Sequence, residues 1–393
     1  MTPAARLQAA IEVLDEVIAA VRDDGPPADS IVTRYFKQRR YAGSGDRRAV
    51  RELVFRAIRR SAERPENGRS AIIGLADDDP PLRDLFGQLR GPEPPDEAEL
   101  GTVPSGGTVP GWLAPELSSL LGETEWAALL DRAPVDLRVN AAHTARDSLL
   151  GEFPDATATP FSPWGIRLPA GSKIDDHPAY RSGLVEVQDE GSQLIALACA
   201  PRDGEAIVDL CAGAGGKALA LAAAAPGATI LATDSNRVRL SHLAPRADRA
   251  GARIETLLLN PPNELDQLDD WHGKADLVLV DAPCSGSGTW RRNPEGRWRL
   301  TPERLDRLVT LQARLLDLGA ELVRPGGRLV YAVCSLLSRE GAGQIQGFLS
   351  RRSSWIVQET PFAAGRSEGA GRLLTPGHDG TDGFFVASLG RAC

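Results

Sequence analysis

Apolar side chains recur at a helical spacing near the start of this chain. Residues 4–22 carry them on one helical face, and residues 46–62 repeat the pattern behind Asp46, which we expect to be an N-cap. The spacing predicts an all-helical domain over residues 1–90. Pro, Gly and acidic residues dominate 91–111, so we expect a linker there.

The pattern becomes mixed after this linker. A helical spacing continues over 112–131, whereas 135–139 and 166–168 are short runs rich in β-forming residues. These features predict a small α+β domain over 112–184.

From about residue 185, short apolar runs alternate with helical stretches. Such alternation is typical of βαβ units and predicts an α/β domain over 185–393, with a mostly parallel, Rossmann-like sheet and helices on both faces. The last run, 383–389, predicts an added strand near the sheet edge. The other runs cover 206–210, 229–234, 254–259, 275–281 and 328–334, and the helical stretches cover 217–225, 237–250 and 302–323.

Composition restricts the class of protein. Hydrophobic residues make up 42% of the chain, but no stretch is long enough to cross a bilayer, and the first helix carries charges throughout. We therefore expect a cytoplasmic monomer with no membrane partner. The odd number of cysteines and their spacing argue against a disulfide framework and against a metal site. They are Cys199, Cys211, Cys284, Cys334 and Cys393.

The net charge of −8 argues mildly against a nucleic-acid partner, but the positive charge is unevenly distributed. One basic group lies between positions 34 and 60 and includes Arg39 and Arg40. In the second group Trp290 and Trp298 are interspersed, and they could stack on bases or pack inside the protein. Either group could be a solvated helix surface or a phosphate-binding surface. The second group includes Arg291, Arg292 and Arg297.

A glycine-rich segment from Asp209 to Lys217 follows the first predicted strand of the α/β domain. Its glycines let the backbone approach a ligand at the carboxyl edge of the sheet. The dinucleotide pattern G-x-G-x-x-G is absent because Ala218 holds its last position, which favours S-adenosylmethionine over NAD. Asp234 ends the next strand, where it could accept hydrogen bonds from ribose hydroxyls or simply serve as a turn residue.

Cys284 and Cys334 follow the fourth and fifth predicted strands, so both should lie at the edge where the glycine-rich segment opens. A lone cysteine is usually a small buried hydrophobe, but two at one cofactor edge favour chemistry. A thiolate that adds to carbon 6 of cytosine makes carbon 5 nucleophilic enough to accept a methyl group, and a second group must then manage the proton. Lys217 could favour the thiolate, and Asp281 could hold the base.

Together these residues resemble the Sun-type family of RNA cytosine-C5 methyltransferases, which includes bacterial enzymes of the small-subunit ribosomal RNA. The resemblance covers about residues 110–390, and it is carried by Asp-Ala-Pro-Cys-Ser-Gly-Ser-Gly at 281–288 and by the Cys-Ser pair at 334–335. It implies a class I methyltransferase core with a seven-stranded sheet. The helical N-terminus is similar to a NusB-type RNA-binding domain. Shorter matches are Leu137–Asn140, Val187–Glu190, Arg324–Gly327 and Asp382–Phe385.

The resemblance also implies a role for each site residue. Cys334 would be the nucleophile on a cytosine of RNA, with 16S ribosomal RNA as the expected substrate, and Cys284 would help to release the product. Asp281 would act with them as a catalytic residue. S-adenosylmethionine contacts would fall on Cys211, Ala212, Gly213, Ala214, Gly215, Gly216, Lys217, Asp234, Asn260 and Asp281.

The chain departs from the family pattern without losing a catalytic group. Gly213 and Ala214 replace Ala-Pro, Asn260 replaces an Asp that contacts adenine, and Val333 replaces a Thr. After Glu340 the usual acidic-polar run is shortened. Three alternatives stay open: the same chemistry on transfer RNA, an RNA-binding assembly factor, and a Rossmann oxidoreductase, which leaves both cysteines unexplained.

Overall fold

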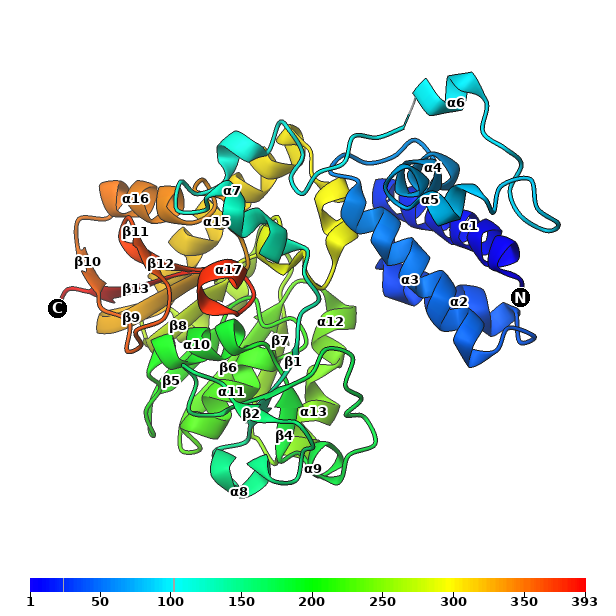
Figure 1. Ribbon diagram of the computed structural model, residues 1–393. Coiled ribbons are helices and arrows are strands. Elements are labelled where there is room, and N and C mark those ends of the chain that lie inside the picture. Colours follow the sequence, from blue (N-terminus) through cyan, green and yellow to red (C-terminus); the bar gives the residue numbers. More distant parts are fainter. Residues whose placement is uncertain (24, 102) are drawn as a thin grey trace. The chain divides into compact units, whose positions relative to one another are not determined.

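Contacts within the computed structural model divide the chain into two compact units, coloured in Figure 1 by position along the sequence. The structure describes residues 1–23, 25–101 and 103–393. We call the two units the helical unit and the sheet unit. The helical unit comprises Met1–Leu117, Gly122–Asp131 and Thr289–Pro302, and the sheet unit comprises Ser118–Leu121, Arg132–Gly288 and Glu303–Cys393.

The apolar faces of four longer helices form the core of the helical unit, to which Leu7, Val54 and Ile72 contribute. The helices predicted from the spacing over 4–22 and 46–62 are confirmed. The prediction that Asp46 is the N-cap is wrong, because Gly43 is the N-cap. Asp46 is the third helical residue, and its carboxylate accepts a hydrogen bond from the backbone N–H of Gly43. The helices are α1 (Pro3–Arg22), α2 (Ala28–Gln38), α3 (Ser44–Arg60), α4 (Gly68–Asp78), α5 (Pro80–Arg83) and α6 (Glu97–Gly101).

Residues 289–302 belong to the helical unit, although we expected 185–393 to form one domain. This segment contains the short helix η5 (Pro294–Arg299). Trp298 is buried in the core formed by the N-terminal helices, and its indole N–H donates to the carbonyl of Ser61 at 2.9 Å. The ring supplies apolar surface that the helices bury, which is why the segment groups with them.

The helix predicted over 112–131 is wrong. Short turns replace it, because Pro115 cannot continue a helical hydrogen-bond ladder and Gly122 starts a new turn as an N-cap. The turns are η1 (Ala114–Glu116), α7 (Glu123–Trp126) and η2 (Ala127–Leu129).

A four-stranded antiparallel sheet lies within the sheet unit, in the order β2-β3-β1-β4. Leu137, Ile166 and Val185 contribute to its core. The strands predicted near 135–139 and 166–168 are confirmed. The elements are β1 (Val135–Val139), α8 (Arg146–Leu150), β2 (Thr157–Ala158), β3 (Gly165–Leu168), α9 (Pro178–Arg181) and β4 (Val185–Val187).

The large sheet has the order β11-β12-β13-β9-β8-β5-β6-β7, with β10 paired to β13. The five strands from β5 to β9 pair in parallel, and β13 adds antiparallel to β9. The strands are β5 (Ala206–Asp209), β6 (Thr229–Asp234), β7 (Glu255–Leu258), β8 (Ala275–Asp281), β9 (Val323–Val333), β10 (Trp355–Gln358), β11 (Arg366–Glu368), β12 (Gly371–Leu374) and β13 (Phe384–Arg391).

Helices cover both faces of this sheet, as the alternation along β8 demonstrates. Leu277 and Leu279 lie in the core that α10 and α11 complete, whereas Val278 and Val280 face α15 at Gly319, where an added Cβ would lie 2.9 Å from Val280. The helices are α10 (Glu190–Cys199), α11 (Gly216–Ala224), α12 (Arg237–Ser241), α13 (Leu243–Ala250), α14 (Glu264–Gln267), η3 (Asp269–Trp271), η4 (Ser287–Thr289), α15 (Pro302–Leu322), α16 (Ala342–Arg351) and α17 (Pro376–Asp379).

Two expectations about this sheet are wrong. Among the described residues it has nine strands rather than seven, because the short strands β10, β11 and β12 pair with β13 or lie beyond it. The last strand, β13, lies inside the sheet and not near its edge. Seven of its eight residues are buried, which an edge position with one open side would not allow.

Candidate active site

Four parallel strands bring the predicted site residues to one edge of the sheet. Asp209 ends β5, Asp234 ends β6 and Asp281 ends β8, and their neighbours in register place them on adjacent strands. Asp281 pairs with Ala332 of β9, two residues before Cys334. The carboxyl ends of parallel strands therefore gather these side chains, as the strand pattern predicts.

The glycine-rich loop after β5 is held by backbone bonds and by Asp234. Ala212 N–H donates to the carbonyl of Thr233 at 2.8 Å, and Gly213 N–H donates to Asp234 Oδ2 at 2.8 Å. Gly215 has a φ of +80°, and a Cβ on it would lie 2.5 Å from Leu243 Cγ. Only glycine satisfies both constraints, so the loop can turn tightly into the N-terminus of α11.

Lys217, at the start of α11, and Asp281, at the end of β8, form an ion pair. Lys217 Nζ lies 2.6 Å from Asp281 Oδ2 and 5.5 Å from the centre of the Phe384 ring. Burial opposes the ammonium charge, but the carboxylate of Asp281 outweighs it and raises the pKa of Lys217. Lys217 therefore stays protonated at neutral pH, beside the carboxylate of Asp281.

The sulfur atoms of Cys284 and Cys334 lie 3.3 Å apart. Both thiols are free and half-buried. The hydrogen bond to Cys334, and after it burial, raises the pKa of Cys284 well above the ordinary value for a thiol. The two cysteines thus form one coupled pair in which Cys284 is held as the neutral partner.

The remaining predicted cofactor residues differ in how open they are. Burial raises the pKa of Cys211 well above its ordinary value. Asp209 is fully buried, and burial raises its pKa to about 7. Asn260 is exposed, and its backbone N–H donates to Gln267 Oε1 at 2.7 Å. Asn260 thus keeps its side chain available for a ligand.

Arg138 of the small sheet and Arg246 of α13 support the glycine-rich loop, and the sequence did not identify them as part of the site. Arg138 donates to the carbonyl of Gly216 at 2.7 Å. Arg246 donates to the carbonyl of Ala214 at 2.6 Å and is itself paired at 3.0 Å with the buried carboxylate of Glu186. The motif around Arg138 was visible in the sequence, but these carbonyl partners lie in distant segments.

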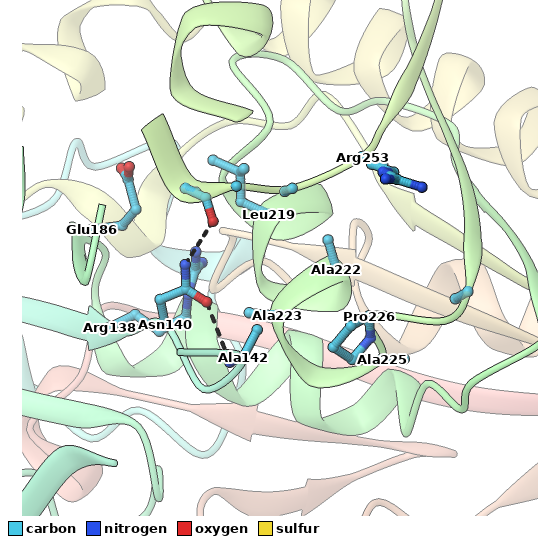
Figure 2. Close-up of a pocket in the computed structure, with 14 residues that line it drawn as sticks. Arg138, Asn140, Ala142, Glu186, Leu219, Ala222, Ala223, Ala225, Pro226 and Arg253 are labelled. Atoms are coloured by element: carbon cyan, nitrogen blue, oxygen red, sulfur yellow. Dashed lines mark hydrogen bonds between the residues drawn. The ribbon is translucent and has the colours of Figure 1, made fainter. Parts of the chain in front are cut away.

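A separate cavity of about 150 Å³ lies beside the C-terminal half of α11 (Figure 2). Arg138, Asn140 and Ala222 line it, and Asn140 is tied down by its bonds to Ala142 and to the carbonyl of Ala250. Ligand pockets typically measure roughly 300–1,000 Å³, so this one is too small for a nucleoside. Neither Cys284 nor Cys334 lines this cavity.

The structure corrects the expected phosphate-binding arginines. Arg297 is 1% exposed and donates to the carbonyls of Ile58, Arg59, Ser61 and Thr108, so it caps the end of α3 rather than meeting RNA. Arg291 is also buried, and so are Trp290 and Trp298, for which packing is the correct interpretation. Arg39 stacks on Tyr35 and forms an ion pair with Glu12. Of the other two predicted RNA-binding arginines, Arg292 is half-buried and Arg40 is exposed.

Replacing Arg297 by lysine should destabilise the helical unit by about 2–4 kcal/mol, because one ammonium cannot reach all the carbonyls that the guanidinium serves. Burial lowers the pKa of Arg297 to about 9, so this charge depends on those carbonyls. Urea unfolding of the full chain, followed by circular dichroism, measures the effect. Arg299→Lys is the matched control, since Arg299 is half-buried on the same short helix and should change stability by less than about 1 kcal/mol. Equal losses in both variants would contradict the capping role.

Among the described residues, no three His, Cys, Asp or Glu side chains are arranged to hold a metal ion. In the same part of the chain, no helix combines the length and the hydrophobicity that crossing a membrane requires.

Comparison with solved structures shows a shared fold. The crystal structure of PH0851 superposes with a TM-score of 0.74 at 23% identity, covering 99% of both chains. NSun6 from Pyrococcus horikoshii, solved with SFG, has a TM-score of 0.65 at 18% identity, covering 72% of this chain and 98% of that one. The expected Rossmann-like methyltransferase fold is therefore confirmed.

Comparison with sequences identifies the family. The profile described as 16S rRNA methyltransferase RsmB/F matches residues 196–390. Ribosomal RNA small subunit methyltransferase B of Salmonella arizonae is 35% identical over 288 residues, which cover 71% of this chain. The chain spans 66% of the length of that relative. The site residues lie at the sheet edge as described, and this chain belongs to the RsmB/F methyltransferase family.

Proposed function

We propose that this chain transfers a methyl group from S-adenosylmethionine to carbon 5 of a cytosine in 16S ribosomal RNA. The observation that carries the proposal is the 3.3 Å contact between Cys284 and Cys334, at the strand ends that also hold the glycine-rich loop. Two thiols at one cofactor edge suit a reaction that needs a covalent nucleophile and a proton-transfer group. The name of the Salmonella relative supports small-subunit ribosomal RNA as the substrate.

The glycine-rich loop and Asp234 fit S-adenosylmethionine. At Gly215 a side chain would clash, so the bare backbone can approach a ligand. The carboxylate of Asp234 accepts hydrogen bonds from Gly213 N and Asn236 N, and its free lone pairs can accept ribose hydroxyls. The NSun6 structure was solved with SFG, an S-adenosylmethionine analogue, which supports the same cofactor here. When bound, the cofactor supplies an electrophilic methyl group.

Cys334 acts as the nucleophile in this proposal. Its thiolate forms a bond to carbon 6 of cytosine, and the electron pair of the 5,6 double bond moves to carbon 5, which takes the methyl group. Lys217 places a positive charge at the same sheet edge and so favours the thiolate. Asp281, with 27% of its side chain exposed, can hold the base through its amino group or ring nitrogen.

Cys284 manages the proton on carbon 5. Two thiols in contact do not readily ionise together, because the two negative charges would repel. Once Cys334 is bonded to carbon 6 it carries no charge, so Cys284 can then lose its own proton to water and, as a thiolate, accept the proton from carbon 5. The bond from carbon 5 to hydrogen breaks, the 5,6 double bond forms again, and the bond from carbon 6 to sulfur breaks to release the product.

We infer that the chain holds RNA through a NusB-like domain over residues 1–90, which lies within the helical unit. Arg40 and the neighbouring Tyr41, which is 76% exposed, suit contact with phosphate and with an unstacked base. Arg292 is the remaining candidate of the second basic group. Arg291 and Arg297 leave the proposed RNA surface because both are buried.

Bisulfite sequencing of total RNA, from cells with and without this gene, tests the proposed function. We expect one protected cytosine of 16S ribosomal RNA to lose its protection without the gene. Loss at a transfer RNA position instead would favour the transfer RNA alternative. Unchanged protection everywhere would support the assembly-factor alternative and refute the proposal.

Replacing Asp234 by alanine should weaken S-adenosylmethionine binding by about 1–3 kcal/mol, because both the ribose partner and the brace on Gly213 are lost. Isothermal titration calorimetry of the two proteins measures the change. Asp203→Ala is the matched control, since Asp203 accepts a hydrogen bond from Gly227 N at 2.7 Å but precedes β5, at the opposite edge of the sheet. An unchanged affinity of Asp234→Ala would remove Asp234 from the cofactor site.

A further inference from the structure

A buried carboxylate, that of Glu340, lies behind the two loops that carry the cysteines. Glu340 is 0% exposed and belongs to the turn between β9 and α16. No step of the proposed reaction uses it. A carboxylate placed so deeply needs strong hydrogen bonds, because removing its charge from water costs several kcal/mol.

Two of these bonds hold the Cys284 loop. Glu340 Oε1 accepts from the backbone N–H of Ser285 at 2.8 Å and from Gln312 Nε2 at 2.9 Å. Gln312, which is fully buried on α15, also donates to the carbonyl of Pro283 at 2.9 Å. The residues on both sides of Cys284 are therefore fixed to the same carboxylate and amide.

The other oxygen of Glu340 holds the Cys334 loop. Glu340 Oε2 accepts from Ser335 Oγ at 2.5 Å, and Ser335 directly follows Cys334. The backbone carbonyl of Glu340 accepts from the hydroxyl of Tyr331, on β9, at 2.7 Å. Ser335 Oγ also lies 3.2 Å from Ser285 Oγ, so the two loops are joined to each other as well as to Glu340.

We propose that Glu340 is a positioning residue, whose carboxylate joins the residue after Cys284 to the residue after Cys334 and so holds the two thiols in contact. The inference rests on the proposed function, in which these thiols act in succession on one base. Charge-assisted hydrogen bonds are roughly twice as strong as neutral ones, so one carboxylate can fix both loops. An error of about 1 Å in such a pair can cost on the order of a hundredfold in rate.

The negative charge of Glu340 affects the protonation of Cys284, in addition to the hydrogen bonds that position the two loops. The hydrogen bond that Cys284 donates to Cys334, and burial, raise the pKa of Cys284 most, and the negative charge of Glu340 raises it further. The carboxylate of Glu340 therefore also favours the neutral form of Cys284 while Cys334 is the free thiolate.

Thiol cross-linking with dibromobimane tests, in the full chain and without requiring turnover, whether Glu340 holds the two thiols in contact. This reagent becomes fluorescent only when it has alkylated two neighbouring thiols, and mass spectrometry identifies the Cys284–Cys334 product. We expect Glu340→Ala to slow this cross-link by about tenfold, the factor that corresponds to losing one charge-assisted hydrogen bond. Glu340→Gln should stay within about threefold of the unchanged protein, because its amide can accept from Ser285 N and donate to Ser335 Oγ.

Two further variants separate positioning from general destabilisation. Asp379→Ala removes another buried carboxylate, which accepts from the backbone N–H groups of Gly365 and Thr375, and it should leave the cross-linking rate unchanged. Ser335→Ala removes the bond from the Cys334 loop to Glu340, together with the Ser335 contacts to Ser285 and Ser287, and keeps the Glu340 bond to the Cys284 loop. It should slow the cross-link even if Glu340→Ala does not fold. Equal cross-linking rates in Ser335→Ala and the unchanged protein would overturn the proposal, and so would an equal loss in Asp379→Ala and Glu340→Ala.

The outcome is independent of the proposed function. If the chain transferred no methyl group to RNA, the cross-linking rates would still report whether Glu340 holds the thiols together. If it does transfer one, Glu340→Ala should lower kcat while the affinity for S-adenosylmethionine stays within about twofold, and Glu340→Gln should restore most of kcat. Full kcat in Glu340→Ala would contradict the positioning role.

Discussion

Replacing Cys334 by alanine should abolish methyl transfer to RNA, with a loss in kcat of at least about 10⁴-fold. Without the thiolate, carbon 5 of cytosine is too weak a nucleophile to take the methyl group, and no other cysteine among the described residues directly follows β9. Transfer of a radioactive methyl group to unmodified 16S ribosomal RNA measures the loss. Calorimetry should show that S-adenosylmethionine binding is retained, because the glycine-rich loop does not depend on Cys334.

Cys393→Ala serves as the control for this substitution. Cys393 is an exposed thiol outside the site, so its loss should leave turnover unchanged. If Cys334→Ala kept measurable turnover while Cys284→Ala did not, the nucleophile would be Cys284 and the proposed order of events would be reversed.

Replacing Cys284 by alanine should have an effect of comparable size but a different form. Cys334 can still attack carbon 6 and the methyl group can still be transferred, but the proton on carbon 5 then lacks its acceptor. The enzyme should therefore accumulate as a covalent complex with RNA, visible as a slow band on a denaturing gel. Multiple-turnover methylation should fall to near zero while a single methyl group per enzyme is still transferred.

The double variant Cys284→Ala, Cys334→Ala supplies the control for the adduct. It should form no denaturation-resistant band, since the bond to RNA requires the Cys334 sulfur. A band in Cys334→Ala but not in Cys284→Ala would show that the two cysteines exchange roles, and a band in neither would remove the covalent mechanism.

The large sheet was predictable because its strands carry strong local signals. The runs at 229–234 and 275–281 match β6 and β8 residue for residue, since each is mostly apolar and ends on an acid. Parallel order then sufficed to bring Asp234, Asp281 and both cysteines to one edge. The number of strands was not predictable, because β10, β11 and β12 are short and form only by pairing with or beyond β13.

The residues that the sequence did not reveal act through partners far along the chain. Gln312 and Glu340 look like ordinary polar positions of a helix and a turn, and only folding shows that both meet the Cys284 loop. Arg297 was misread for the same reason. A basic residue near aromatic rings is typical of an RNA surface, but its carbonyl partners at Ile58 and Ser61 lie more than 200 residues earlier.

The assignment of residues 289–302 to the helical unit has a consequence for synthesis of the protein. The N-terminal helices are translated before this segment, so their core lacks the Trp298 ring, and the end of α3 lacks Arg297, until the segment itself has been translated. By then β5 through β8 have also been translated. The N-terminal helices therefore depend on residues 289–302 to complete their core. Because this segment interrupts the sequence of the sheet unit, neither unit can be produced whole by cutting the gene at a single point.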